Sequence, residues 1–162
     1  MKIILKIAIV LFLVTLIPCC NKDKTQKSKP FLTAKIDGVN YSFNDKVDLN
    51  GTKEISHIIN GFNEELKTRI MLGLNLENQK TGTFELKHNT VLVYHSHNIF
   101  KGKRIRYIWH AKESVIGSSG TITIIKNTDA YIEGTFSFNG VGAVKVDTSI
   151  KKITEGKFKV LK

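Results

Sequence analysis

Cysteine is scarce in this chain, and the two cysteines that it contains are adjacent. The 162 residues include two cysteines, Cys19 and Cys20, close to the N-terminus. Residues 21–162 contain none, so the main part of the chain has no internal disulfide and must be stabilised by a hydrophobic core. A chain of this length can bury enough apolar surface to fold on that basis.

Acidic residues are also scarce. Lysine and arginine together number 25 against 14 aspartates and glutamates, which gives a formal net charge of +11, and no acid precedes Asp23. Such an excess of positive charge often indicates a nucleic-acid partner. We exclude nucleic acid as the partner, because the N-terminal segment predicts export and an exported protein rarely meets it.

The first 19 residues have the pattern of a bacterial export signal. Lys2 and Lys6 precede an apolar run over residues 7–17 that only Thr15 interrupts, which is the order of a positive region followed by a hydrophobic region. A helix that spans a bilayer needs about 20 consecutive apolar residues, so this run is too short. It ends in the letters LIPCC, which resemble the lipobox of bacterial lipoproteins.

The cysteine pair is the predicted site of lipid attachment. A thiolate is a soft nucleophile that can take a lipid in a stable thioether, and two or more acyl chains anchor a protein durably. The residue before the acceptor is normally small, so Cys20 after Cys19 fits better than Cys19 after Pro18. We predict lipidation of Cys20, with Cys19 as the alternative acceptor. A buried cysteine pair or a vicinal disulfide is the competing interpretation.

Cleavage before Cys20 divides the chain into three parts. Residues 1–19 form the predicted signal peptide, residues 20–30 the lipidated cysteine with a lysine-rich tether, and residues 31–162 a single domain. The tether is either a solvated linker or a second contact with the membrane, because lysines are attracted to anionic head groups.

The predicted domain consists of short alternating runs that are typical of antiparallel strands. In FLTAKIDGVNYSF, Asp37 and Gly38 can adopt the positive φ angles of a type I′ turn. TRIMLGLNL alternates apolar residues at every second position, and no segment sustains a helical period. We predict an all-β antiparallel meander that forms a sandwich or a partly closed barrel. One face of the first hairpin is predicted to be core: Leu32, Ala34, Ile36, Val39, Tyr41 and Phe43.

The order of these runs along the chain is informative. FLTAKIDGVNYSF, GTFEL, GSSGTITI, GTFSFNG and ITEGKFKV together resemble an uncharacterised family of Bacteroidetes lipoproteins, domain of unknown function 6252. The resemblance implies an all-β domain that is tethered to the outer membrane and faces the periplasm or the cell surface. It implies no catalytic residue and no cofactor.

One predicted hairpin gathers histidine and arginine on a single face. A turn at Lys101 and Gly102 pairs Tyr94 with Trp109 on the core side. The opposite face then carries His95, His97, Arg104, Arg106 and His110. His-x-His spacing is used for zinc and copper, but the arginines repel a cation and neither strand carries an acid. A solvated basic face or an anion site fits better, and we expect this face to attract anions before metals.

No catalytic signature accompanies this face. Ser118 and Ser119 lie in a glycine-rich turn without a Gly-x-Ser-x-Gly elbow, so we assign no catalytic residue, no metal ligand and no cofactor. The expected function is that of a lipid-anchored binding or structural module of the cell envelope. Its expected partners are the membrane, through the anchor, and an anionic lipid or glycan. The alternative is an envelope hydrolase that acts on glycan or lipid.

The predicted anchor is tested by substituting each cysteine in the full-length chain. Cys20→Ala should abolish labelling by a fatty-acid analogue and Cys19→Ala should retain it, because only the acceptor thiolate forms the thioether. Mass spectrometry of the N-terminus should show an acylated Cys20. Loss of labelling in Cys19→Ala alone would move the anchor by one residue. Labelling that survives in the double variant would refute lipidation.

Overall fold

The computed structural model describes residues 29–162 apart from 53–54, 77–79, 87–89, 101 and 144–147, and it describes no side chain at 98–100 and 104. The predicted signal peptide, both cysteines and most of the predicted tether therefore lie outside the described residues. Within the described ranges the chain forms eleven β-strands. The described residues include no helix that is long and apolar enough to cross a membrane.

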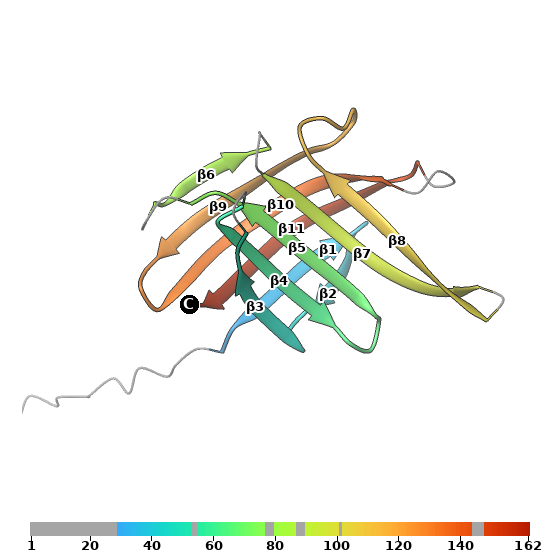
Figure 1. Ribbon diagram of the computed structural model, residues 1–162, viewed down its shortest axis with the longest axis horizontal. Coiled ribbons are helices and arrows are strands. Elements are labelled where there is room, and N and C mark those ends of the chain that lie inside the picture. Colours follow the sequence, from blue (N-terminus) through green and yellow to red (C-terminus); the bar gives the residue numbers. More distant parts are fainter. Residues whose placement is uncertain (1–28, 53–54, 77–79, 87–89, 101, 144–147) are drawn as a thin grey trace, which may run out of the picture.

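The strands form one curled antiparallel sheet. In chain order they are β1 (Phe31–Ile36), β2 (Val39–Ser42), β3 (Lys46–Asn50), β4 (His57–Asn63), β5 (Thr68–Leu74), β6 (Gly82–Glu85), β7 (Val91–Phe100), β8 (Lys103–Ala111), β9 (Ser119–Asn127), β10 (Tyr131–Gly142) and β11 (Ile150–Leu161). The spatial order is β2-β1-β11-β10-β8-β7-β5-β4-β3, and β9 pairs with β10 and with β6 off this path. The sheet makes a half-barrel (Figure 1), which confirms the predicted all-β fold class.

The two ends of the sheet are joined by the short link between β2 and β3. In this link the side chain of Asn44 accepts a hydrogen bond from the Leu32 amide at 2.7 Å, and Asn44 forms a β-bridge with Phe62 of β4. Gly61 permits the close approach, because a Cβ atom there would lie 2.9 Å from the Cβ of Phe43 and 3.0 Å from that of Leu32. This seam therefore draws β1 and β4 together.

The core fills the inside of the curl. Apolar side chains at alternate positions of β1, β5, β7, β8, β9, β10 and β11 are almost fully buried in it. The long strands β10 and β11 contribute a reciprocal arrangement, in which Phe136 pairs with Gly156 and Gly134 with Phe158. Each aromatic ring therefore covers a glycine on the neighbouring strand, because only a glycine leaves room for a ring that lies over the backbone.

The first hairpin has the predicted turn. Asp37 (φ 49°) and Gly38 (φ 86°) are both in the left-handed region, and Ile36 pairs with Val39 across them. The predicted core face is shorter than expected, since Val39 is 59% exposed whereas Phe43 is fully buried. Val39 lies beside the turn on β2, which ends the sheet, so no strand covers it from the other side.

The aromatic-on-glycine pairs make a specific prediction about stability. In Gly156→Ala the added methyl group would lie 2.6 Å from the Phe136 ring, so we expect the free energy of unfolding to fall by about 1–3 kcal/mol. The exposed neighbour Lys157 provides the control, and Lys157→Ala should change it by less than about 0.5 kcal/mol. Urea unfolding measures both. An unchanged midpoint in Gly156→Ala would show that the ring moves aside without cost.

Candidate anion-binding site

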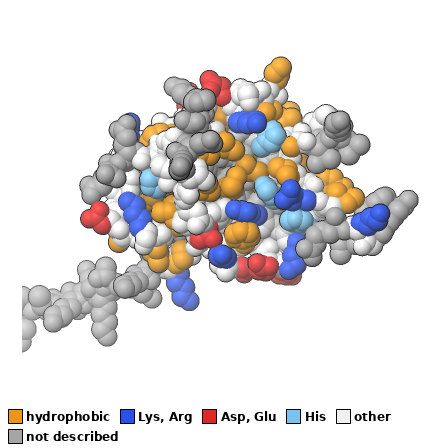
Figure 2. Space-filling model, in the orientation of Figure 1, with side chains coloured by type: hydrophobic (Ala, Val, Ile, Leu, Met, Phe, Trp, Pro, Cys, Tyr) orange, Lys and Arg blue, Asp and Glu red, His pale blue; other side chains and the backbone are white. Residues whose placement is uncertain are grey.

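The hairpin of β7 and β8 has the predicted register. Tyr94 pairs with Trp109 and Leu92 with Ala111, and the Tyr94 and Trp109 rings stack inside the core with their centroids 5.5 Å apart. Because successive side chains of a strand alternate between the two faces, His95 and Arg106 lie on the outer face. Figure 2 shows histidine and arginine or lysine side chains gathered there beside hydrophobic side chains.

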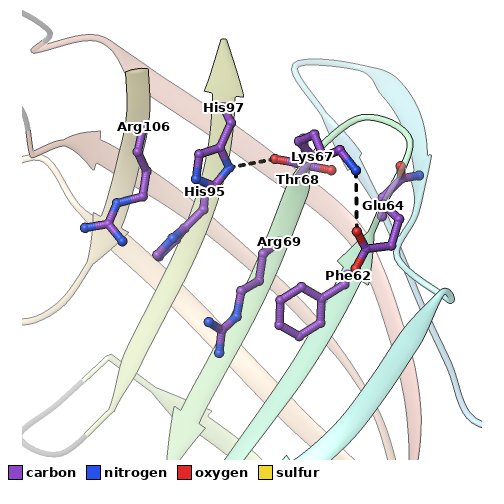
Figure 3. Close-up of a pocket in the computed structure, with 9 residues that line it drawn as sticks. Phe62, Glu64, Lys67, Thr68, Arg69, His95, His97 and Arg106 are labelled. Atoms are coloured by element: carbon purple, nitrogen blue, oxygen red, sulfur yellow. Dashed lines mark hydrogen bonds and ion pairs between the residues drawn. The ribbon is translucent and has the colours of Figure 1, made fainter. Parts of the chain in front are cut away.

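A cavity of about 290 Å³ lies on this outer face, against the turn between β4 and β5. Three of the predicted residues line it: His95, His97 and Arg106. The remaining lining residues come from β4, from β5 and from the turn, and Figure 3 shows their side chains.

Of the other two predicted residues, His110 does not line this cavity, and the structure describes no side chain for Arg104. His110 pairs with Val93 on one side and with Val141 on the other, and it does not line the cavity. Burial, and then the charge of Lys112, lowers the pKa of His110. Arg104 of β8 pairs with Ile99 of β7, but the side chain of Arg104 is outside the described residues.

Arg69 is the residue that the sequence analysis missed. It lies on β5 between Phe62 of β4 and His95 of β7, in one row across three strands. Its guanidinium lies 4.7 Å from the centroid of the Phe62 ring and donates a hydrogen bond to the Asn60 side-chain oxygen. Asn60 is itself buried and donates to the Asp48 carboxylate at 2.7 Å. The guanidinium is therefore held in place without direct contact with a carboxylate in the described structure.

His97 is oriented by the backbone of the β4–β5 turn. Its Nδ1 atom lies 2.9 Å from the carbonyl oxygen of Lys67, and because a carbonyl oxygen can only accept, Nδ1 carries the hydrogen. In the neutral ring Nε2 is then an acceptor. The Lys67 ammonium pairs with the Glu64 carboxylate at 3.6 Å, so the one acid among the described lining residues already has a cationic partner.

His95 is neutral at physiological pH. Burial, followed by the charges of Arg69 and Arg106 and by the proximity of His97, lowers the pKa of His95 to about 4. No described residue makes a hydrogen bond with its ring. A neutral imidazole beside two guanidinium groups adds no positive charge to the cavity, but its pKa responds to any anion placed there.

One buried polar atom of a residue that lines the cavity, Nε of Arg69, has no partner among the described residues. Oγ1 of Thr68 also has none, but Thr68 alternates with Arg69, so its side chain lies on the inner face with Ile70. A buried donor without an acceptor is costly, so a bound acceptor group would relieve that cost. The described residues include no group of three or more potential metal ligands. The chemistry of the cavity therefore suits an anion.

The shifted pKa of His95 is directly testable by NMR. Its ring proton should titrate near pH 4, and Arg69→Gln should raise that pKa, because one of its causes is removed while burial remains. His110→Gln, on the same face but outside the cavity, should leave it unchanged. Since the folded pKa lies below the unfolded value of about 6.5, protonation of His95 should reduce stability as the pH falls from about 6.5 to 4. Titration near pH 6.5 would contradict the described geometry.

Comparison with known proteins gives a family but no activity. The family model Domain of unknown function (DUF6252) matches residues 28–161, which is nearly the whole described domain. No curated protein and no solved structure matches the chain. The match extends from the end of the predicted tether to the last strand, in agreement with the resemblance seen in the sequence. The chain therefore belongs to the uncharacterised family DUF6252.

Proposed function

We propose that this protein is a Bacteroidetes outer-membrane lipoprotein, anchored through Cys20, whose β domain binds an anionic group of an envelope lipid or glycan. The observation that carries the proposal is the cavity where Arg69 and Arg106 meet His95 and His97. In the described part of the chain neither arginine contacts a carboxylate. Guanidinium groups remain charged at any physiological pH, so their attraction for an anion is permanent.

The place where the tether joins the domain supports an envelope ligand. Leu32, the second residue of β1, packs against Gly61 of β4, and the next residue of β4, Phe62, lines the cavity. A tether of ten residues, 21–30, spans about 35 Å when fully extended. Lipidation of Cys20 would therefore hold the domain close to the head groups of its own membrane.

The hydrolase alternative has one contact in its favour. Ser56 Oγ lies 2.8 Å from Nδ1 of His57, and a nucleophilic serine needs such a neighbouring base. The same oxygen accepts a hydrogen bond from the Leu76 amide at 3.0 Å, and neither residue lines a described cavity. Each of these cavities also has at most one carboxylate in its wall, whereas a glycosidase needs two. The binding module is the better supported function.

Anion binding is tested by calorimetry on the full chain in a neutral detergent, with citrate, inorganic phosphate and zinc chloride as separate titrants. We expect both anions to bind, and Arg106→Gln to weaken binding about tenfold or more, because a charge-assisted hydrogen bond contributes about 1.5–3 kcal/mol.

The matched control for this experiment is Lys126→Gln. Lys126 is exposed on β9 and lines none of the described cavities, so the variant removes the same charge elsewhere and should bind anions as the parent does. Zinc binding that is lost in His95→Ala and His97→Ala, without any response to anions, would show that the cavity serves a metal instead.

A further inference from the structure

We infer that the anion is a phosphate monoester, bound between Arg69 and Arg106, and that an imidazole of the cavity takes the remaining proton of the ester. This inference rests on the proposed anion binding and narrows its ligand. It follows from the charges, the fixed donors and the protonation states of the lining residues.

The charge of the cavity matches two negative charges. Arg69 on β5 and Arg106 on β8 have no carboxylate contact among the described residues, and Figure 3 shows their side chains on either side of His95. Glu64 and Lys67 in the turn offset each other. Asp48 on β3 reaches Arg69 only through Asn60. A carboxylate would neutralise one guanidinium, whereas the dianion of a phosphate monoester neutralises both.

Two guanidinium groups approach the cavity from separate strands, Arg69 from β5 and Arg106 from β8. Asn60 and the Phe62 ring hold the Arg69 guanidinium in place, and its Nε–H has no partner among the described residues. Three non-ester oxygens on one phosphorus atom can accept from donors in different directions, which a planar carboxylate cannot do as well.

The two imidazoles favour a ligand that brings its own proton. The neutral His97 ring can only accept at Nε2, because its Nδ1 hydrogen is donated to the Lys67 carbonyl. His95 is neutral because burial and the arginines lower its pKa to about 4. A sulfate or a carboxylate offers only acceptors, and Nε2 of the neutral His97 ring has no hydrogen to donate to them. A phosphate monoester, whose second pKa is about 6, can donate one hydrogen bond.

The proton transfer is balanced within the complex. The P–O–H proton of the monoanionic ester moves to the free imidazole nitrogen of His97 or His95, which leaves a phosphate dianion and an imidazolium. The new dianion raises the pKa of His95 and so opposes the effect of the arginines. Binding of the dianion from solution requires instead that the same proton be taken from water.

The test compares three titrants on the full chain in neutral detergent: glycerol 3-phosphate, methyl sulfate and glycerate. We expect glycerol 3-phosphate to bind at least tenfold more tightly than the other two. At pH 7.5 the complex with glycerol 3-phosphate should take up a fraction of a proton as it forms. Calorimetry in two buffers of different ionisation enthalpy measures this uptake. Equal or tighter binding of glycerate would overturn the phosphate assignment and leave anion binding intact. Failure of all three to bind would overturn the proposed function itself.

Histidine variants distinguish proton uptake by the imidazoles from the attraction of the anion by the arginines alone. In the double variant His95→Gln and His97→Gln, proton uptake should vanish and the preference for phosphate over sulfate should fall at least fivefold. The matched control is His110→Gln, on the same face outside the cavity, which should retain both. Proton uptake that persists in the double variant would overturn the assigned role of the imidazoles.

A lipid head group and a soluble ester have the same chemistry, and competition distinguishes them. Phosphatidylcholine vesicles that contain phosphatidic acid, a phosphate monoester lipid, should displace glycerol 3-phosphate from the parent chain and bind Arg106→Gln less tightly if the source is lipid. Vesicles with phosphatidylglycerol, a diester, control for attraction by the lysine-rich tether. Displacement by neither vesicle assigns the site to a soluble ester, and equal displacement by both overturns the preference for a monoester.

Discussion

The domain depends on how a single antiparallel sheet covers its own apolar face. The described chain includes no helix to pack on that face, so the sheet must curl until its two halves meet. The curl requires close approach of backbones, which glycine permits at Gly61 and Gly156. It also requires that the ends be joined, which the Asn44 link achieves through Leu32 and Phe62. Burial in the core then makes the register of each strand costly to change.

This constraint also shapes the outer surface. Once the inner positions of β4, β5 and β7 are committed to the core, the alternate positions form straight rows across the strands. One such row brings Phe62, Arg69 and His95 together. A guanidinium that lies on an aromatic ring and beside a neutral imidazole is thus a result of strand pairing rather than of a loop. A site built on paired strands keeps its geometry better than one built on a connection.

Local order could be predicted from the sequence, and long-range pairing could not. The Asp37 turn and the pairing of Tyr94 with Trp109 followed from turn residues that set a register over a few positions. Arg69 was missed because β5 and β7 are neighbours in space but are joined through a connection that includes β6. His110 was included because it shares a face with Arg106. Four residues along a strand are about 13 Å, however, which is too far for one small ligand.

The position of β1 has a mechanical consequence for a domain tethered at its N-terminus. The strand is hydrogen-bonded to β2 on one side and to β11 on the other, and the chain reaches it from the end at Phe31. A pull on the proposed tether would act along the axis of β1. The hydrogen bonds on both sides would then carry the load together in shear, whereas a strand peeled from an edge loses its bonds one at a time. The domain would therefore resist unfolding by a pulling force that an N-terminal anchor transmits to β1.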